Sequence, residues 1–386
     1  MDISKTYTLH LSPRIVFGVG TAQQVGAEVL RFGVSHVFLV TDTGLAQTDI
    51  PGIVTKSLDA AGVKWTLFSD VEPNPSVGTV QKGLALYTKE GCDGLVAVGG
   101  GSPIDAAKAI GLLATNGGDL HTYFGTDNVK KPIPPLVAIP TTCGTGSEVT
   151  QFTVITDTET HFKMGIGSPH NLPRVAIVDP SLLVKLPSRM VAATGMDALC
   201  HAIESYTSLA AQPVSDAFSL HAIRMIGQHL RTAVANGNLT DLSGMAMASM
   251  LAGMAFNNTR TTLVHAMSHA VTGHAGVPHG VANAILVPYA MEFNLIGSPE
   301  KHGDIAAALG EDTDGLSIMD AARAAVDAVQ ELADDVGIPH TLREVGVTEA
   351  HLEALADDAM KSGGIALNSR RPTRQDVLAL YKKALG

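Results

Sequence analysis

The sequence has few cysteines, no long apolar run and no secretory leader, and each absence argues against a class of protein. Its 3 cysteines are scattered and form no CxxC pair. They predict neither a disulfide framework nor a zinc knuckle, and they are typical of a reducing cytoplasm. No run of about 18 uninterrupted apolar residues occurs, so no membrane-spanning helix is expected. The first residues, MDISKTYTLH, do not resemble a secretory signal.

Positive charge is also scarce. The formal net charge is -11, without basic runs, which argues against nucleic-acid binding through phosphate contacts. The hydrophobic content of 45% is enough to build a large buried core. We therefore expect a globular cytoplasmic protein with no nucleic-acid and no membrane partner.

The 386 residues suit two domains, and the pattern changes between the two halves. The first half alternates helical patterns such as 103–113 with short apolar runs at 36–41, 94–98, 136–139 and 175–178. This alternation predicts a parallel, Rossmann-like sheet. From about Ser188 the apolar residues recur at helical spacing. We predict an α/β domain over 1–185 and an all-helical domain over 186–386.

A glycine-rich turn follows the second of these apolar runs, in GLVAVGGGSPIDAAKAI (94–110). Gly99, Gly100 and Gly101 would let a ligand approach the backbone, and the helix N-terminus after them suits a pyrophosphate. Ser102 is expected to cap this helix, with Asp105 completing a capping box. The GxGxxG fingerprint of many dinucleotide sites is absent. A tight turn without a ligand is the alternative.

Other loops favour a nucleotide site. PTTCGTGSE (140–148) follows a strand and can offer amide and hydroxyl donors to a phosphate or ribose. Within it, Cys143 is interpreted as a buried thiol. Asp42 ends an earlier strand, where a carboxylate can bind a ribose and repel a 2′-phosphate, although it could equally be a turn residue. The turn EPNP (72–75) could present Asn74.

Two groups of acidic and histidine residues predict a metal site. Asp197 and His201 are four residues apart, so one helix face would carry both. The stretch TRTTLVHAMSHAVTGHAGVPHG (259–280) contributes His265, His269 and, further on, His279. Aspartate with several histidines suits Fe²⁺, Zn²⁺ or another divalent ion. Chance clustering is the alternative, and geometry alone would let both His265 and His269 bind.

Four motifs together, GGGSPIDAAKAI, PTTCGTGSEVT, GMDALCHAIE and HAMSHAVTGHAGVPHG, resemble the iron-containing (group III) alcohol dehydrogenases over nearly the whole chain. The resemblance implies the fold shared with dehydroquinate synthase: an NAD-binding α/β domain, a helical metal domain and an active site between them. It also implies a homodimer or higher homo-oligomer, and a small alcohol or aldehyde as substrate.

Site residues follow from this resemblance. It implies metal ligation by Asp197, His201, His265 and His279. It makes His269 a proton-relay residue near the nicotinamide, and it places His274 near the site but not among the ligands. It implies that Asp42 selects NAD over NADP. The implied cofactor contacts are Asn74, Gly99, Gly100, Gly101, Ser102, Thr141, Thr142, Thr145, Ser147 and Lys163.

The expected reaction is hydride transfer between a small alcohol or aldehyde and NAD(H), with Fe²⁺, or Zn²⁺ or another divalent ion, as the Lewis acid. A lyase of the dehydroquinate-synthase type is one alternative, but it would need a Lys and Arg cluster, and Arg260 alone is a weak case. A non-catalytic NAD- or metal-binding scaffold is another. The complete ligand set disfavours a metal-free relative of the maleylacetate-reductase type. Gln151, Phe152, Val154 and Phe256 either line the substrate pocket or pack in the core.

Overall fold

The computed structural model describes residues 6–10, 13–159 and 162–386. The chain divides into two compact units. The first, called here the α/β unit, is His10–Leu186. The second, the helical unit, comprises Pro187–Gly386 together with the described residues that precede His10. Each unit is treated below by itself.

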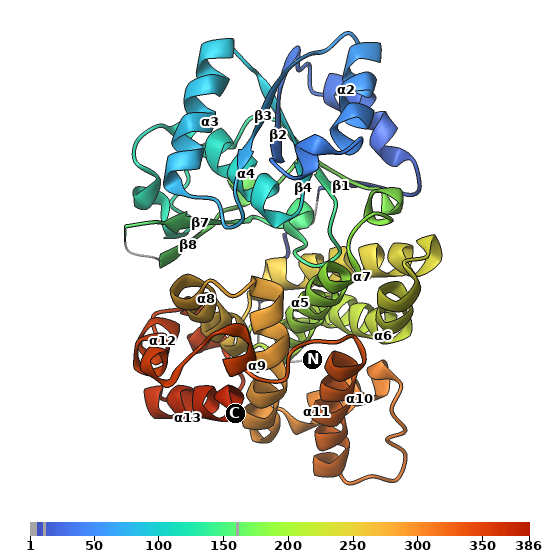
Figure 1. Ribbon diagram of the computed structural model, residues 1–386, viewed down its shortest axis with the longest axis vertical. Coiled ribbons are helices and arrows are strands. Elements are labelled where there is room, and N and C mark those ends of the chain that lie inside the picture. Colours follow the sequence, from blue (N-terminus) through green and yellow to red (C-terminus); the bar gives the residue numbers. More distant parts are fainter. Residues whose placement is uncertain (1–5, 11–12, 160–161) are drawn as a thin grey trace. The chain divides into compact units, whose positions relative to one another are not determined.

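The α/β unit contains a six-stranded sheet in the order β1-β9-β6-β4-β2-β3, in which every neighbouring pair is parallel (Figure 1). The predicted parallel sheet is thus confirmed. The sheet's strands are β1 (Arg14–Phe17), β2 (His36–Asp42), β3 (Lys64–Val71), β4 (Gly94–Gly99), β6 (Leu136–Pro140) and β9 (Val175–Val178). A smaller sheet, in the order β5-β8-β7, is formed by β5 (Gly125–Thr126), β8 (Phe162–Gly167) and β7 (Phe152–Asp157).

Helices cover both faces of the large sheet. Side chains along each buried strand point alternately to the two faces, so each face has an apolar core that a layer of helices covers. On β2, Phe38 and Val40 join a core that includes Val80 of α3 and Ile104 of α4. Val37 and Leu39 point the other way, into a core completed by α1 and α2. The helices are α1 (Val25–Leu30), α2 (Ile50–Ala60), α3 (Val77–Glu90) and α4 (Gly101–Asn116).

This topology brings the predicted cofactor segments to one edge. β4 pairs in parallel with β2 on one side and β6 on the other, with Gly99 opposite Pro140. The carboxyl ends of parallel strands lie at the same edge of a sheet. That edge therefore carries Asp42 at the end of β2, the glycine turn after β4 and the loop after β6. That edge is where open α/β sheets bind their ligands.

The described part of the helical unit contains no strand, in agreement with the sequence pattern. Its long helix α5 (Ser188–Thr207) packs against α6 (Pro213–Asn236), α7 (Leu239–Thr259) and α9 (His279–Asn294). Helix α8 (Leu263–Ala275) packs against α9 and α12. The remaining helices are α10 (Pro299–Leu309), α11 (Ile318–Asp335), α12 (Leu352–Ala359) and α13 (Arg374–Leu385).

One described helix, α7, is long and apolar enough to cross a membrane by length and composition. In the structure, 61% of its most apolar window is buried, and α7 packs on α5 and α6. This is weak evidence for a membrane span, since a buried core helix passes the same test.

Candidate active site

Three helices of the helical unit bring the predicted metal-binding residues together. Asp197 and His201 lie one turn apart on α5, and both are buried. His265 lies on α8, and His279 is the first residue of α9. Pro278, the cap of α9, ends the turn that precedes His279.

The start of α9 lies directly against α5, and a glycine allows this approach. A Cβ atom on Gly280 would lie 2.4 Å from the carbonyl oxygen of Ala193. Real side chains do not reach such a distance, so this position needs glycine. The contact brings His279 to the helix that carries Asp197.

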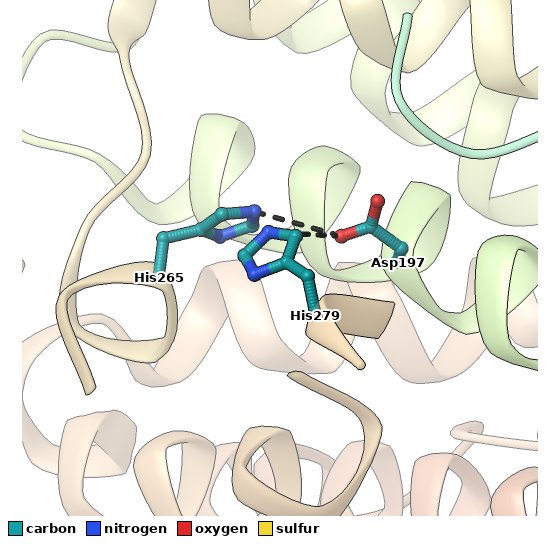
Figure 2. A group of neighbouring side chains, drawn as sticks. All are labelled: Asp197, His265 and His279. Carbon is teal, nitrogen blue, oxygen red and sulfur yellow. Dashed lines mark ion pairs between the residues drawn. The ribbon is translucent and has the colours of Figure 1, made fainter. Parts of the chain in front are cut away.

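Donor atoms of the cluster face one another. The Nε2 atoms of His265 and His279 lie 3.7 Å and 3.8 Å from the same carboxylate oxygen of Asp197 (Figure 2). The Nε2 atom of His201 lies 3.0 Å from that of His265. Ligand atoms bonded at about 2.1 Å to one ion are roughly 3.0–3.5 Å apart in octahedral or tetrahedral geometry. The observed distances of 3.0 Å, 3.7 Å and 3.8 Å lie within or slightly above this range, so the spacing is compatible with a single metal ion.

Neighbouring side chains contact the Nδ1 atoms of His265 and His279 and the ring face of His201. His265 Nδ1 is hydrogen bonded to the carboxylate of Glu204, which requires the proton on Nδ1 and leaves the Nε2 lone pair of the neutral ring directed at the cluster. His279 Nδ1 lies 3.4 Å from the Ser268 hydroxyl. The ring of Phe256 stacks on His201 with centroids 4.3 Å apart. Each imidazole is thus oriented with Nε2 inward.

The electrostatics of the cluster favour a cation. Burial disfavours the charged carboxylate of Asp197, yet His201 and a hydrogen bond from His265 outweigh it and lower its pKa. The pKa of Glu204 is also lowered, since His265 outweighs the effect of burial. The pKa of His265 rises to about 9, because Glu204 and Asp197 overcome the cost of burying its charged form. Without an ion, the proton on His265 therefore compensates part of the negative charge of the two buried carboxylates. A metal ion binds neutral imidazole, so a divalent ion would take over this compensation.

Two residues of this site were missed by the sequence analysis. Glu204 accepts hydrogen bonds from the Thr262 hydroxyl and from the backbone N–H of Val264, besides His265. It lies three residues after His201 on α5, so its position on that helix could have indicated it. The amide nitrogen of Asn283 lies 2.6 Å from Asp197 Oδ1 and 3.1 Å from His279 Nε2. Its side-chain oxygen is buried, with no hydrogen-bond partner in the described part of the chain. Asn283 lies one helical turn after His279 on α9. This spacing is the only feature of the sequence that could have indicated it.

The two other histidines of α8 differ in their surroundings. His269 is half-buried, and its ring stacks on that of His279 with centroids 5.0 Å apart. It therefore borders the cluster next to the ring of His279. His274 is exposed and pairs with Asp358 of α12, outside the cluster.

The predicted cofactor loops of the α/β unit pack against each other. The backbone N–H of Thr141 donates to the carbonyl of Gly99 at 3.0 Å. A Cβ atom on Gly100 would lie 3.3 Å from the Thr142 side chain, and one on Gly101 would lie 3.0 Å from that of Thr145. The Thr142 hydroxyl is buried and has no hydrogen-bond partner among the residues that the structure describes. The two loops therefore form a close backbone cradle that fits the phosphate-binding role expected of them.

A third segment joins the glycine turn. The backbone N–H of Asn74 donates to the Ser102 hydroxyl at 3.3 Å, and Lys163 donates to the Asn74 side chain at 2.7 Å. Asn74 adopts a φ of 56°, a left-handed conformation that costs energy for a residue other than glycine. Strained backbone of this kind is concentrated at functional sites.

The predicted capping box is wrong. Helix α4 begins at Gly101, its cap is Gly100, and no side chain caps it. Ser102 instead accepts from Asn74, as described above. Asp105 accepts from the Ser147 hydroxyl and from the backbone N–H of Val154. Tertiary contacts have replaced the local pairing.

Asp42 and Ser147 are each already engaged. Asp42 ends β2, and its Oδ1 atom accepts from the backbone N–H of Leu45 at 2.8 Å, as a turn residue does. Among the described residues, no hydrogen bond to its Oδ2 atom is found, so the turn role and the proposed ribose contact are compatible. Ser147 is buried, and its hydroxyl is hydrogen bonded to Asp105 and Lys108.

Comparison with known proteins identifies the chain. The profile of the iron-containing alcohol dehydrogenases matches residues 12–180, and the C-terminal profile of the same family matches residues 191–385. The chain belongs to the iron-containing alcohol dehydrogenase family. It is thus an oxidoreductase, and the family implies a divalent metal. The lyase and scaffold alternatives are set aside.

Individual relatives extend over almost the whole chain. The 1,3-propanediol dehydrogenase of Klebsiella pneumoniae is 46% identical over 97% of this chain and 98% of its own length. A crystal structure of 1,3-propanediol oxidoreductase has a TM-score of 0.97 and 44% identity, covering 99% of this chain and 100% of that one. The sulfoacetaldehyde reductase of Bifidobacterium kashiwanohense, solved in complex with NAD⁺, has a TM-score of 0.87 and 30% identity, covering 98% and 99%.

Proposed function

We propose that the protein is an NAD(H)-dependent dehydrogenase of small alcohols and aldehydes, with a divalent metal held by Asp197, His201, His265 and His279. One observation carries the proposal: three imidazoles present Nε2 to one another or to the Asp197 carboxylate, in a site with two buried carboxylates. When bound, the divalent ion supplies Lewis acidity at the substrate oxygen, and NAD(H) carries the hydride. Oxygen and imidazole donors suit Fe²⁺, and Zn²⁺ or another divalent ion is compatible.

The chain's own residues hold and orient these groups. Glu204 fixes the ring of His265, and Phe256 supports that of His201. Phe256 therefore has a packing role at the site. His269 borders the cluster and is the residue proposed to move the substrate proton, since imidazole titrates near neutral pH.

In the α/β unit, the proposed NAD(H) contacts are the backbone of Gly99, Gly100 and Gly101 with the side chains of Ser102, Thr141, Thr142, Thr145 and Ser147. Asn74 and Lys163 extend this group, and the free oxygen of Asp42 would bind an adenosine ribose. The close packing of the loops and the unpartnered hydroxyl of Thr142 support the assignment. A solved relative that binds NAD⁺ supports it independently.

The substrate class is inferred as a short alcohol or aldehyde with a second polar group. The relatives reported above are named for 1,3-propanediol and sulfoacetaldehyde, both short and polar. A cytoplasmic location agrees with three buried cysteines that form no disulfide bond with one another. A homodimer or higher homo-oligomer is part of the same proposal.

The test is a screen of short alcohols, diols and aldehydes with NAD(H). The protein is reconstituted with Fe²⁺ under anaerobic conditions, and a parallel sample with Zn²⁺. We expect metal-dependent turnover with about one ion bound per chain. An Asp197→Ala variant is the control and should bind no ion. Metal-independent turnover, or turnover in Asp197→Ala, would contradict the proposal.

A further inference from the structure

A fully buried lysine in the α/β unit has no role in the site described so far. The side chain of Lys108 on α4 is 0% exposed. Its Nζ atom donates to the carbonyl oxygens of Ser147 and Phe152, both at 2.7 Å, and to the Ser147 hydroxyl at 2.9 Å. The Thr150 hydroxyl lies 3.4 Å away. All of these partners belong to one short segment, 147–152.

Asp105, three residues earlier on the same helix face, binds the same segment. Its carboxylate accepts from the Ser147 hydroxyl at 2.6 Å and from the backbone N–H of Val154 at 2.9 Å. Its backbone carbonyl accepts from the Thr153 hydroxyl at 2.8 Å. Asp105 and Lys108 also form an ion pair of 3.9 Å. The segment 147–154 is therefore fixed to α4 at both of its ends.

The two connected pieces are the ones that carry the proposed cofactor loops. Helix α4 begins in the glycine turn, at Gly101. The segment 147–154 continues from the loop that holds Thr141, Thr142 and Thr145. A shift of 147–154 along α4 would change the distance between the glycine turn and these hydroxyls.

We infer that Asp105, Lys108 and Ser147 form a positioning unit that sets the spacing of the two cofactor loops. The inference rests on the proposed NAD(H) site and goes beyond it, because it gives Asp105 and Lys108 a role that needs no contact with the cofactor and adds a positioning role to the contact proposed for Ser147. The Ser147 hydroxyl donates to Asp105 and accepts from Lys108, so Ser147 acts through the other two residues.

The charges explain why the unit needs all of its partners. Burial lowers the pKa of Lys108 to about 8, against the opposing effect of Asp105 and Glu148. Burial also raises the pKa of Asp105, which Lys108 and the Ser147 hydrogen bond counteract. A buried charge without its partner is costly. Removing Lys108 would take the Nζ donor from the carbonyl oxygens of Ser147 and Phe152 and the compensating positive charge from the Asp105 carboxylate, and we expect the segment to shift as a result.

The test measures NAD⁺ binding directly, by titration calorimetry of the metal-loaded full chain, reading both Kd and stoichiometry. Lys108→Met keeps the length of the side chain and removes its donors. We expect its Kd for NAD⁺ to rise by about 10–100-fold at near-normal stoichiometry, the size expected when buried donors are lost and a bound geometry shifts. Lys82→Met, the same change at an exposed position of α3, is the matched control and should leave Kd unchanged.

The two readouts separate positioning from mere stability. If Lys108 only stabilises the fold, stoichiometry falls with the unfolded fraction and Kd stays at the wild-type value, which would overturn the inference. If Lys108→Met does not fold, Asp105→Asn takes its place, since it keeps the shape and the Val154 contact. Asp105→Asn should raise the Kd for NAD⁺ less than Lys108→Met does. An unchanged Kd in Asp105→Asn would also overturn the inference. Failure of wild-type protein to bind NAD⁺ would instead refute the proposed function.

Discussion

The two units build their sites from different kinds of atoms. In the helical unit, the donors are side chains from α5, α8 and α9, and each has its own partner behind it, such as Glu204 behind His265. In the α/β unit, the candidate site consists largely of backbone and hydroxyl groups at one edge of the parallel sheet. Asp42 and Lys163 are the charged side chains proposed there.

This difference predicts different responses to substitution. A metal site depends on a few ligands, and the loss of one leaves the others without their common ion. A cofactor site built from backbone amides shares its contacts among many groups. Substituting one side chain there should therefore change affinity or selectivity less than the loss of one metal ligand. The predictions below test this contrast.

The largest effect is expected for His279→Ala. The variant should lose both its metal and its activity, by roughly 10⁴-fold or more, because the ion supplies the Lewis acid. Metal analysis beside steady-state kinetics measures both. His279 is half-buried, with a side chain 24% exposed, so the variant should fold. His274→Ala is the control, since His274 is exposed and pairs with Asp358. Full metal occupancy in His279→Ala would remove His279 from the ligand set.

His269→Ala should have the next largest effect and should separate chemistry from metal binding. We expect the variant to retain its metal and to turn over about 10²–10⁴-fold more slowly, as for loss of a general base. The pH profile of alcohol oxidation should lose the limb near the imidazole pKa. If the metal is lost with the imidazole, His269 is a ligand and the distinction between the histidines of α8 is wrong.

The same contrast explains what the sequence could predict. The four apolar runs became the four interior strands, β2, β4, β6 and β9, since buried parallel strands are continuously apolar. The two edge strands, β1 and β3, were missed. On β3, Trp65 and Leu67 are 37% and 40% exposed, and the strand mixes polar and apolar residues. An edge strand therefore lacks the signal that identified the interior ones.

Side-chain chemistry was easier to find than its support. The helical spacing of Asp197 and His201, together with the histidines of residues 259–280, predicted a metal site from the sequence alone. Nothing local indicated that Asp105 would bind Ser147 instead of capping its own helix, because that hydrogen bond joins residues 42 positions apart. The spacing of Glu204 from His201 could have indicated Glu204 itself, but not its bond to His265, which is 61 positions away. Such contacts follow from the packing of elements that the chain brings together.

Glu204→Gln tests the support of the metal site. Glutamine keeps an oxygen for the Thr262 and Val264 contacts but removes the charge. Metal affinity should fall by about 10–100-fold, the usual cost of losing a hydrogen-bond partner of a ligand histidine. Competition with a chelator measures it, and NAD⁺ affinity is the internal control. Unchanged metal affinity would mean that the carboxylate does not stabilise the bound ion.

The smallest effect is expected at Asp42, in the cofactor-binding unit. Asp42→Asn is a sharper test than Asp42→Gly, because asparagine can still accept from Leu45 and so preserves the turn. It removes only the negative charge that would repel the 2′-phosphate of NADP. We expect the kcat/KM for NADP relative to NAD to rise by about 10-fold, which corresponds to roughly 1.4 kcal/mol. Metal content should not change. If the ratio stays constant in Asp42→Asn but shifts in Asp42→Gly, the turn and not the charge sets selectivity. If neither variant shifts it, Asp42 does not face the ribose.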